Sequence, residues 1–337
     1  MLKRILVLML ISFLFCGCSK DKREIVTFSS WGSVTEVSVI KSIITKFEEK
    51  NPDIKINFIH IPQNYFQKIH LLFASNTAPD IIFINNLYLP VYKNKLKSLN
   101  ELADKNVFFE QSSNAMTIDG DIFAIPRDVS NFVIYYNKNY IKSEPKTFAE
   151  FDRQIKQRYG KNIFGISYER DIFYAEPYIL TLGYDDGIKY YTDLEGNFAP
   201  RPSDAGSSTQ AQMFLNGKLA FYMSGRWMYP KINETAKFDY GIMTFPGKTY
   251  ADASGWAISK NTKHAESAEK FVTFLSSKES IDYFTSTGLI VPARKDSAEI
   301  FRGKDRVFTD AIGKTETRPV DYDYNKNRDK INRKLFR

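Results

Sequence analysis

An uninterrupted apolar run, Ile81-Ile-Phe-Ile84, is the feature that most restricts what this chain can fold into. A strand whose successive side chains are all apolar is typical of a parallel sheet covered by helices on both faces. Two earlier runs, 24–29 and 54–61, have strand character and alternate with helical patterns. This order predicts a β-α-β-α-β unit with a parallel sheet and right-handed crossovers. Asp80, just before the run, is expected to cap or anchor the structure.

The helices between these strands have clear start and stop signals. Ser33 and Glu36 have the spacing of a capping box, in which the serine oxygen accepts from a helical N–H and the glutamate reaches back. Apolar residues then follow at spacings of three and four. Because proline cannot continue a helix, Pro52 marks the end of the pattern. A second helix is expected over 65–74.

A second α/β unit is expected after a tight turn at Asp119-Gly120. Extended segments are predicted over 122–126 and 132–136, and Thr147 is the predicted N-cap of the next helix. An amphipathic helical pattern covers 265–275. With 337 residues, of which 43% are hydrophobic, the chain is long and apolar enough to form two lobes.

The first eighteen residues have the character of a targeting segment. Lys3 and Arg4 precede an apolar run over 5–15. This run is too short to span about 30 Å of hydrocarbon as a helix but suits a signal-peptide core. The following Cys16-Gly17-Cys18 resembles a bacterial lipoprotein signal, in which Cys18 would become the lipidated first residue, with acyl groups such as palmitate. The alternative is an ordinary secretory signal, and either places the mature protein outside the cytoplasm.

The cysteine content and the charge distribution argue against several classes of protein. Cys16 and Cys18 are the only cysteines, so the body holds neither a disulfide scaffold nor a cysteine catalyst. The formal charge is +8, and 302–337 carries eleven basic against six acidic residues. No nucleic-acid-binding motif accompanies this excess. We therefore expect a solvated surface, or a face toward anionic lipid or a permease, and no nucleic-acid partner.

Short sequence blocks are spread in order over most of 24–294. They are Trp31…Glu36, Ala78-Pro79-Asp80, Asp119-Gly120, Ile125-Pro126, Tyr135-Tyr136-Asn137-Lys138, Gly217-Lys218-x-Ala220, Gly225-x-Trp227, Phe245-Pro246-Gly247, Gly255-Trp256-Ala257 and Ile290-Val-Pro292. This series resembles the extracellular solute-binding lipoproteins of carbohydrate ABC importers, in the maltose, glycerol-phosphate and oligosaccharide-binding group. One stretch, 183–217, is short for that family.

The resemblance implies an α/β, two-lobed periplasmic-binding-protein-like fold of type II. Each lobe would be a mostly parallel sheet flanked by helices, with the ligand in the cleft and closure by hinge motion. The expected division is a signal peptide over 1–17, a tether over 18–24, lobe 1 over 25–128 plus 255–293, and lobe 2 over 129–254 plus 294–337. The implied function is capture of a sugar or sugar-like solute and its delivery to the transmembrane subunits of an ABC permease, by a monomer lipid-anchored outside the cytoplasm, on the periplasmic side in a two-membrane cell.

Residue chemistry and position select candidate ligand contacts. Sugar hydroxyls need paired donors and acceptors, and their C–H faces pack on aromatic rings. Ligands of open α/β sheets bind beyond the carboxyl ends of strands. Trp227 follows a strand and begins a helical segment, which aims N–H groups outward. The candidate ligand-binding residues are Trp31, Glu36, Tyr65, Asn85, Asn86, Arg127, Asp128, Phe173, Tyr174, Arg226, Trp227, Gly255, Trp256 and Arg294.

Two other ligands remain open at this point. Convergence of two among Arg127, Arg226 and Arg294 would favour an anionic polyol such as glycerol phosphate, whereas salt bridges would leave them structural. Neighbouring tyrosines at 135–136 and 190–191 suggest ferric-ion uptake. However, adjacent strand residues point to opposite faces, so the first pair cannot share one ion.

Enzyme interpretations have little support. The sequence has no Gly-x-Ser-x-Gly elbow, His-Glu-x-x-His, Walker loop or Gly-x-Gly-x-x-Gly. Its three histidines, at 60, 70 and 264, lack the spacing of a metal site. We therefore expect no catalytic residue, no metal and no cofactor.

Overall fold

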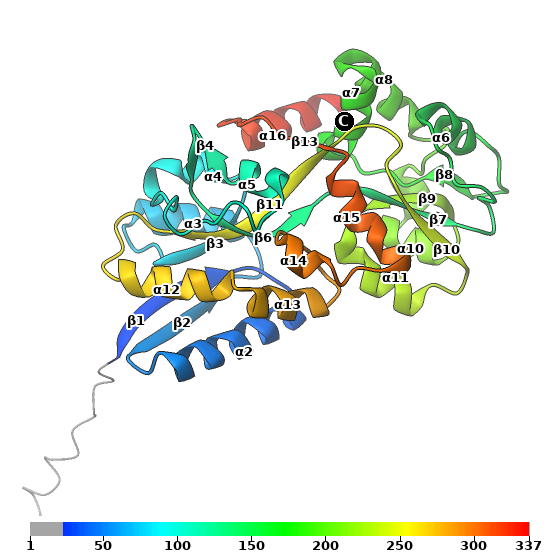
Figure 1. Ribbon diagram of the computed structural model, residues 1–337. Coiled ribbons are helices and arrows are strands. Elements are labelled where there is room, and N and C mark those ends of the chain that lie inside the picture. The colour runs from blue at the N-terminus through cyan, green and yellow to red at the C-terminus, as the bar shows by residue number, and fades with distance from the viewer. Residues whose placement is uncertain (1–22, 337) are drawn as a thin grey trace, which may run out of the picture.

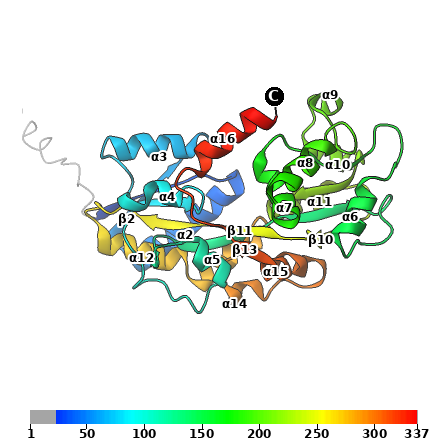
Figure 2. The ribbon, with the colours of Figure 1, turned by 90° about the horizontal axis from the view of Figure 1, so that it is seen from above.

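The structure is a computed structural model that describes residues 23–336, so the predicted signal peptide and Cys18 lie outside the described residues. Two lobes lie side by side, one built on a seven-stranded sheet and the other on a four-stranded sheet (Figure 1 and Figure 2). This arrangement confirms the predicted two-lobed α/β fold. Within the described range, no helix has the length and apolar character needed to cross a membrane.

The larger sheet contains the strands that open the chain. Its strands are β1 (Glu24–Ser30), β2 (Ile54–His60), β3 (Ile81–Asn85), β6 (Ile125–Ser130), β11 (Thr249–Ile258), β12 (Val291–Pro292) and β13 (Thr315–Thr317). Their order is β12-β6-β11-β3-β1-β2, and β13 pairs with β11. Strand β1 runs parallel to both β2 and β3, which confirms the predicted β-α-β-α-β unit.

Strand β3 is covered on both faces, as its apolar run predicts. Ile81 and Phe83 belong to one apolar cluster, whereas Ile82 and Ile84 belong to another, and all four are at most 1% exposed. On the first face lie α2 (Val34–Lys50), α12 (Ala265–Leu275) and α13 (Lys278–Ser286); on the second lie α3 (Tyr65–Ala74), α4 (Leu89–Tyr92) and α5 (Glu110–Ala115) (Figure 1). Because successive side chains of β3 point to opposite faces of the sheet, they contact both layers of helices.

Capping residues set the helix starts that the sequence predicts. The Ser33 hydroxyl oxygen accepts from the Glu36 N–H at 3.3 Å, and a Glu36 carboxylate oxygen accepts from the Ser33 N–H at 2.9 Å. Thr147 caps α6 (Phe148–Ile155) by accepting from the N–H of Glu150 at 3.2 Å. Each cap satisfies N–H groups that have no partner inside the helix.

The smaller sheet has the order β10-β7-β9-β8. Its strands are β7 (Val133–Asn137), β8 (Phe164–Ile166), β9 (Leu219–Ser224) and β10 (Tyr240–Thr244). Its helices are α6, α7 (Ile172–Leu182), α8 (Tyr184–Leu194), α9 (Pro202–Ala205), α10 (Gln210–Leu215) and α11 (Tyr229–Thr235).

The expectation of mostly parallel sheets is wrong in this lobe, because β7 runs antiparallel to both of its neighbours and only β8 and β9 are parallel. Strand β7 enters from the larger lobe and β10 leads back to it without a helical crossover, so they run in opposite directions. Strand β11 likewise enters the larger sheet antiparallel to β3 and β6.

The chain passes between the lobes through short connections. Only Asn131 and Phe132 separate β6 of the larger sheet from β7 of the smaller one. Residues 245–248 connect β10 to β11, which returns to the larger sheet. Short elements complete the chain: β4 (Thr117–Ile118), β5 (Asp121–Ile122), α14 (Lys295–Ala298), α15 (Arg306–Ile312), α16 (Tyr324–Leu335), and 3₁₀ turns over Lys93–Lys95, Arg226–Met228 and Gly303–Asp305.

The C-terminal segment contacts both lobes. Helix α14 packs beside α13 and β12, whereas α15 packs on β10. In α16, the Asn325 side chain donates to the Leu87 carbonyl at 3.1 Å, and Arg328 forms an ion pair with Asp171, the N-cap of α7. Figure 2 shows α16 lying across the side of the molecule where the two lobes meet.

Candidate functional site

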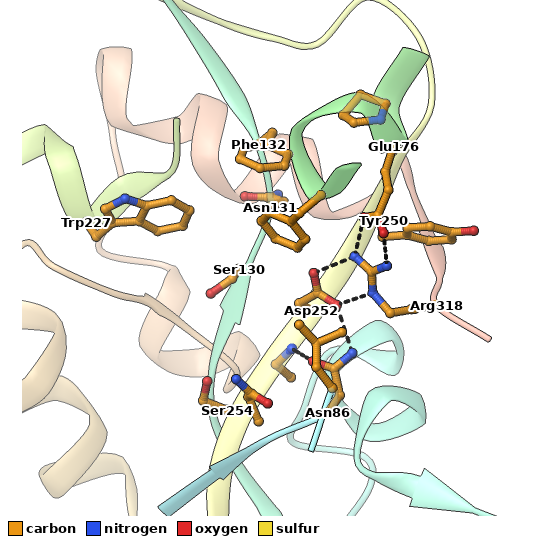
Figure 3. Close-up of a pocket in the computed structure, with 15 residues that line it drawn as sticks. Asn86, Ser130, Asn131, Phe132, Glu176, Trp227, Tyr250, Asp252, Ser254 and Arg318 are labelled. Atoms are coloured by element: carbon orange, nitrogen blue, oxygen red, sulfur yellow. Dashed lines mark hydrogen bonds and ion pairs between the residues drawn. The ribbon is translucent and has the colours of Figure 1, made fainter. Parts of the chain in front are cut away.

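Two adjoining cavities lie between the lobes. The first, of about 170 Å³, is lined by the turn after β3, the β6–β7 connection, α7, β11 and Arg318 (Figure 3). The second, of about 340 Å³, is lined by the start of α2, β6, the turn before α11 and residues 289–291. Ser130, Asn131, Trp227 and Ser254 line both. Ligand sites typically measure about 300–1,000 Å³, so the joined cavities have the size of one.

The turn after β3 brings Asn85 and Asn86, two of the candidate ligand contacts, to the first cavity. The Asn85 side-chain oxygen accepts from the N–H of Tyr88 at 3.1 Å, which holds the turn. The Asn86 amide donates to Asp252 at 2.8 Å and accepts from the N–H of Ala253 at 3.2 Å. Asn86 is therefore fixed to β11.

A buried ionic cluster forms one wall of the first cavity (Figure 3). Arg318 donates two hydrogen bonds of 2.7 Å to Glu176 and two, of 2.7 and 2.9 Å, to Asp252. The Tyr324 hydroxyl donates to Glu176 at 2.8 Å. Burial acts to lower the pKa of Arg318, but the carboxylates of Asp252 and Glu176 outweigh it and raise the pKa well above its usual value. Arg318 is therefore charged, and four of its five N–H groups donate to carboxylates.

Aromatic rings supply the apolar surface of the first cavity. Phe132 and Phe173 pack edge to face with ring centroids 5.2 Å apart. Tyr250 lies under the Arg318 guanidinium at 4.3 Å. Trp227, 41% exposed, lies apart from Phe132 and Tyr250 in the same cavity (Figure 3). Such rings match the C–H faces of a sugar.

The second cavity contains three charged side chains, all of them candidate ligand contacts. The Arg127 guanidinium donates to Asp128 at 2.6 Å and lies 3.3 Å from a Glu36 oxygen. It also lies 4.2 Å from the centre of the Phe83 ring. Burial raises the pKa of Asp128, and Arg127 opposes that rise. Arg127 thus has two carboxylate partners before any ligand arrives.

Arg226 lines the same cavity, so two of the three selected arginines converge. Its guanidinium lies 3.3 Å from Asp305 and 4.3–4.7 Å from the ring centres of Tyr229, Phe301 and Phe308. Its Nε and Nη1 atoms have no hydrogen-bond partner. The charge is therefore held by one carboxylate and by aromatic faces.

The charged side chains that line the two cavities nearly balance. They are Arg127, Arg226 and Arg318 against Glu36, Asp128, Glu176 and Asp252. Three positive and four negative groups give a net charge of −1. The cleft therefore carries no positive excess.

A family model settles where the chain belongs. The model for bacterial extracellular solute-binding proteins matches residues 42–312. The chain belongs to this family. The match covers most of both lobes and includes the residues that line the second cavity from Arg127 to Val291.

Individual relatives of this solute-binding protein are distant in sequence. It is 26% identical over 322 residues to the maltodextrin-binding protein MdxE of Bacillus subtilis, with 82% of this chain and 74% of MdxE covered. It is 27% identical over 231 residues to a maltooligosaccharide ABC transporter solute-binding lipoprotein of Streptococcus pneumoniae, covering 58% of this chain and 54% of that protein.

Solved structures share the fold. The ABC substrate-binding protein Lmo0181 of Listeria monocytogenes, solved with cycloalternan, has a TM-score of 0.80 at 21% identity, covering 93% of this chain and 92% of that chain. The sugar-binding protein MalE of Xanthomonas citri has a TM-score of 0.79 at 20% identity, covering 93% and 91%. Both match nearly the whole of the two-lobed solute-binding protein.

The structure places five of the selected residues away from both cavities. Tyr65 and Trp256 are core residues of the solute-binding protein: the Tyr65 hydroxyl lies 3.0 Å from that of Ser29, and Trp256, 1% exposed, packs between Phe83 and Phe284. Their size and apolar surface are used for packing instead. Trp31, in contrast, lines the second cavity, and its ring centroid lies 4.4 Å from that of Phe83.

The other three candidate residues that line neither cavity also have structural roles. Tyr174 packs on Phe132, with ring centroids 5.2 Å apart, behind the first cavity. Gly255 lies within β11, where a Cβ atom would come within 2.2 Å of the Ile125 carbonyl oxygen. Arg294 forms an ion pair with Asp296 at 2.8 Å. The neighbouring Asp296 carboxylate thus accounts for the position of the Arg294 guanidinium without a ligand.

Several cleft residues were missed by sequence reasoning. Glu176, Asp252 and Arg318 come from three distant segments, and no local pattern predicts their meeting. Asn131 had a usable signal, because it is a polar residue in the short connection between two predicted strands. Of the fourteen selected residues, nine line a cavity: Trp31, Glu36, Asn85, Asn86, Arg127, Asp128, Phe173, Arg226 and Trp227.

The neighbouring tyrosines do not form an ion site. The buried Tyr135 hydroxyl donates to the Gly225 carbonyl at 3.0 Å, whereas Tyr136 packs on the opposite face of the small sheet. Tyr190 donates to Asp152, and Tyr191 to the Glu169 carbonyl. Between residues 23 and 336 there is also no group of three or more His, Cys, Asp or Glu side chains placed to hold a metal ion.

Proposed function

We propose that this protein captures a neutral saccharide outside the cytoplasm and delivers it to the transmembrane subunits of an ABC permease, acting as a monomer and without catalysis. The observation that carries the proposal is the composition of the interlobe cleft. It combines aromatic faces at Trp227, Phe132 and Phe173 with amide and hydroxyl groups. This combination matches the apolar faces and polar edges of a sugar ring.

The state of the arginines favours a neutral ligand over glycerol phosphate. Arg318 and Arg127 each have two carboxylate partners, and Arg226 has one. An anion would have to displace the carboxylates from Arg127 and Arg318. Of the buried guanidinium atoms in the described residues, only Nε and Nη1 of Arg226 lack a partner and are free to donate to it. It would also meet a lining of net charge −1. Because anions are bound tightly where donors and cations are free to face them, this cleft is a poor anion site.

The relatives' names point the same way. MdxE is named for maltodextrin and the Streptococcus protein for maltooligosaccharide, and the latter is named a lipoprotein of an ABC transporter. These names support a saccharide ligand, a permease partner and a lipid anchor for this chain.

Closure on the ligand would follow from the lobe division. We assign 25–128 plus 255–293 to lobe 1 and 129–254 to lobe 2. The segment 294–337, which the sequence analysis places in lobe 2, contacts both lobes, because α14 packs on α13 and β12 and β13 pairs with β11, whereas α15 packs on β10. The connections at 131–132 and 245–248 are then the hinge segments that absorb the change in backbone angles. A cleft lined from both sides of such hinges encloses its ligand when the lobes approach.

Attachment to the membrane is assigned to Cys18 and is tested by fatty-acid labelling. Cells that express the full chain are fed an alkyne analogue of palmitate, and the protein is then purified and coupled to a fluorophore. We expect the Cys16→Ser variant to retain the label and the Cys18→Ser variant to lose it. Equal labelling of both variants would refute Cys18 as the lipidation site.

A thermal-shift panel tests the ligand class. The panel contains maltose, maltotriose, glucose, glycerol 3-phosphate, glucuronate and Fe(III). A ligand that binds only the native state stabilises it by about 2.7 kcal/mol at a hundred times its Kd, which raises the melting temperature. We expect neutral saccharides to raise it. The proposal fails if only glycerol 3-phosphate, glucuronate or Fe(III) does so.

Lack of catalysis is tested on the same sample. Maltotriose is incubated with the protein and then separated by chromatography. We expect maltotriose to be recovered unchanged, and release of maltose or glucose would show a glycosidase instead.

A further inference from the structure

Four residues form a junction between the two cavities. Ser130, Asn131, Trp227 and Ser254 line both, and no other residue in the described part of the chain does so. Ser130 ends β6 and Ser254 lies on the adjacent strand β11, where the chain crosses between the lobes. Trp227 faces them from the smaller lobe (Figure 3). Any ligand that occupies both cavities must pass these four side chains.

The polar side chains of this junction have no hydrogen-bond partner among residues 23–336. Asn131 is 5% exposed, and neither its side-chain nitrogen nor its side-chain oxygen has a hydrogen-bond partner. Within residues 23–336, the Ser130 and Ser254 hydroxyls make no hydrogen bond either. Burial of an amide without partners costs free energy, and most buried polar groups avoid it. Among the described residues, Asn131 is the one buried side chain without partners that lines both cavities.

The chemistry of these groups selects one type of ligand atom. The Asn131 amide offers a donor and an acceptor, and each serine hydroxyl can act as either. A sugar hydroxyl also donates and accepts, so it can satisfy both ends of the amide. A fully ionised phosphate or carboxylate group only accepts, so that group by itself would leave the Asn131 oxygen without a partner. Trp227, across the junction, offers a ring face to the C–H groups of the same sugar.

We propose that Ser130, Asn131 and Ser254, together with Trp227, bind one neutral sugar ring at the junction, and that the ligand continues from this ring into both cavities. The inference rests on the proposed function and extends it in two respects. Asn131 becomes a ligand-binding and specificity-determining residue. The ligand becomes a saccharide of at least two units, because a single ring at the junction leaves the outer parts of both cavities unfilled.

Asn131 gives a test that separates a ligand contact from a structural residue. A structural asparagine would stabilise the fold, so its removal would lower the melting temperature of the ligand-free protein. An asparagine kept for a ligand stabilises nothing until the ligand binds. For Asn131→Ala we therefore expect an unchanged or higher melting temperature without ligand, together with weaker saccharide binding.

The experiment is titration calorimetry of the purified full chain with glucose, maltose and maltotriose. We compare wild type, Asn131→Ala, Ser254→Ala as a second junction variant, and Asn57→Ala, an exposed residue of β2, as the matched control. We expect maltotriose to bind wild type and Asn57→Ala at least tenfold more tightly than glucose. Affinity for maltotriose should fall tenfold or more in Asn131→Ala and threefold or more in Ser254→Ala.

The outcomes distinguish this inference from the function on which it rests. A wild-type protein that binds no neutral saccharide overturns the proposed function and the junction with it. A wild-type protein that binds maltotriose overturns the junction alone if Asn131→Ala binds within twofold of wild type, or if glucose binds as tightly as maltotriose. Should Asn131→Ala fail to fold, an unchanged affinity in Ser254→Ala overturns the junction.

Discussion

Arg318 and Glu176 lie 142 residues apart in the sequence and are joined by two hydrogen bonds of 2.7 Å. Glu176 belongs to α7 of the smaller lobe, and the same guanidinium also holds Asp252 on β11. Through Asp252 the cluster reaches Asn86 of the larger lobe. A single side chain from the C-terminal segment therefore links both lobes at the wall of the first cavity.

Replacement of Arg318 by methionine should destabilise the protein strongly. The change leaves the Glu176 and Asp252 carboxylates buried without their cation, and removal of one partner of a buried ion pair typically costs about 3–5 kcal/mol. Arg306→Met is the matched control, since Arg306 is largely exposed beside Asp310 and an exposed pair contributes about 0–1 kcal/mol. Urea denaturation measures both. A loss below 1 kcal/mol in Arg318→Met would contradict the role of the cluster.

Two tryptophans should respond in opposite ways to truncation. Trp227 is 41% exposed at the junction, so Trp227→Ala should leave the unfolding free energy within about 1 kcal/mol and weaken saccharide binding tenfold or more. Trp256 is 1% exposed in the core, so Trp256→Ala should cost about 3–5 kcal/mol. Denaturation and calorimetry are run on each variant. Unchanged affinity in Trp227→Ala would exclude it as a ligand contact.

Acid should release the contact between α16 and α7. Burial acts to raise the pKa of Asp171, but hydrogen bonds from Arg328, the Phe173 N–H and Asn332 outweigh it, so the pKa lies below its usual value. A carboxyl group with a lowered pKa adds stability above its unfolded pKa of about 3.9 and loses it as the pH falls further.

The test is the melting temperature as a function of pH. Between pH 6 and pH 2.5, the melting temperature of wild type should fall more than that of Asp171→Asn, with the difference concentrated below pH 4. Asp185→Asn, at the exposed start of α8, should follow the wild-type curve. Parallel curves for wild type and Asp171→Asn would show that the ion pair with Arg328 contributes nothing.

Gly255 should tolerate no side chain, although it does not line a cavity. A Cβ atom there would lie 2.2 Å from the Ile125 carbonyl oxygen, which forces β6 away from β11. We expect Gly255→Ala to cost about 1–3 kcal/mol, as overpacking does. In Gly313→Ala the nearest atom lies at 3.7 Å, so this control should change stability little. Equal stability of the two variants would contradict the close packing of β6 on β11.

Local signals in the sequence predicted much of the larger lobe. The capping box at Ser33 and Glu36 and the apolar run of β3 determine their elements without help from distant residues. Asp80 anchors the sheet as expected, because its carboxylate accepts from both the N–H and the hydroxyl of Thr27. Such features depend on residues that are close in the sequence, or on the alternation of side chains between the two faces of a strand.

Contacts between distant segments were beyond sequence reasoning. The mixed smaller sheet follows from β7 and β10 crossing between lobes, which no periodicity records. Trp256 and Trp227 each lie near a glycine in the sequence, so local sequence does not distinguish them. Trp256 is a core residue because Phe83 and Phe284 pack around it, whereas Trp227 lines the cleft. Arg318 has no local partner that would predict its two carboxylates.

Titration calorimetry of the purified full chain with maltotriose and with glycerol 3-phosphate tests the central claim most directly. The aromatic and donor–acceptor groups of the junction predict saturable binding of maltotriose at one site per chain. The arginines paired with carboxylates and the net charge of −1 predict no heat of binding from glycerol 3-phosphate. Saturable binding of glycerol 3-phosphate without binding of any neutral saccharide would contradict the account.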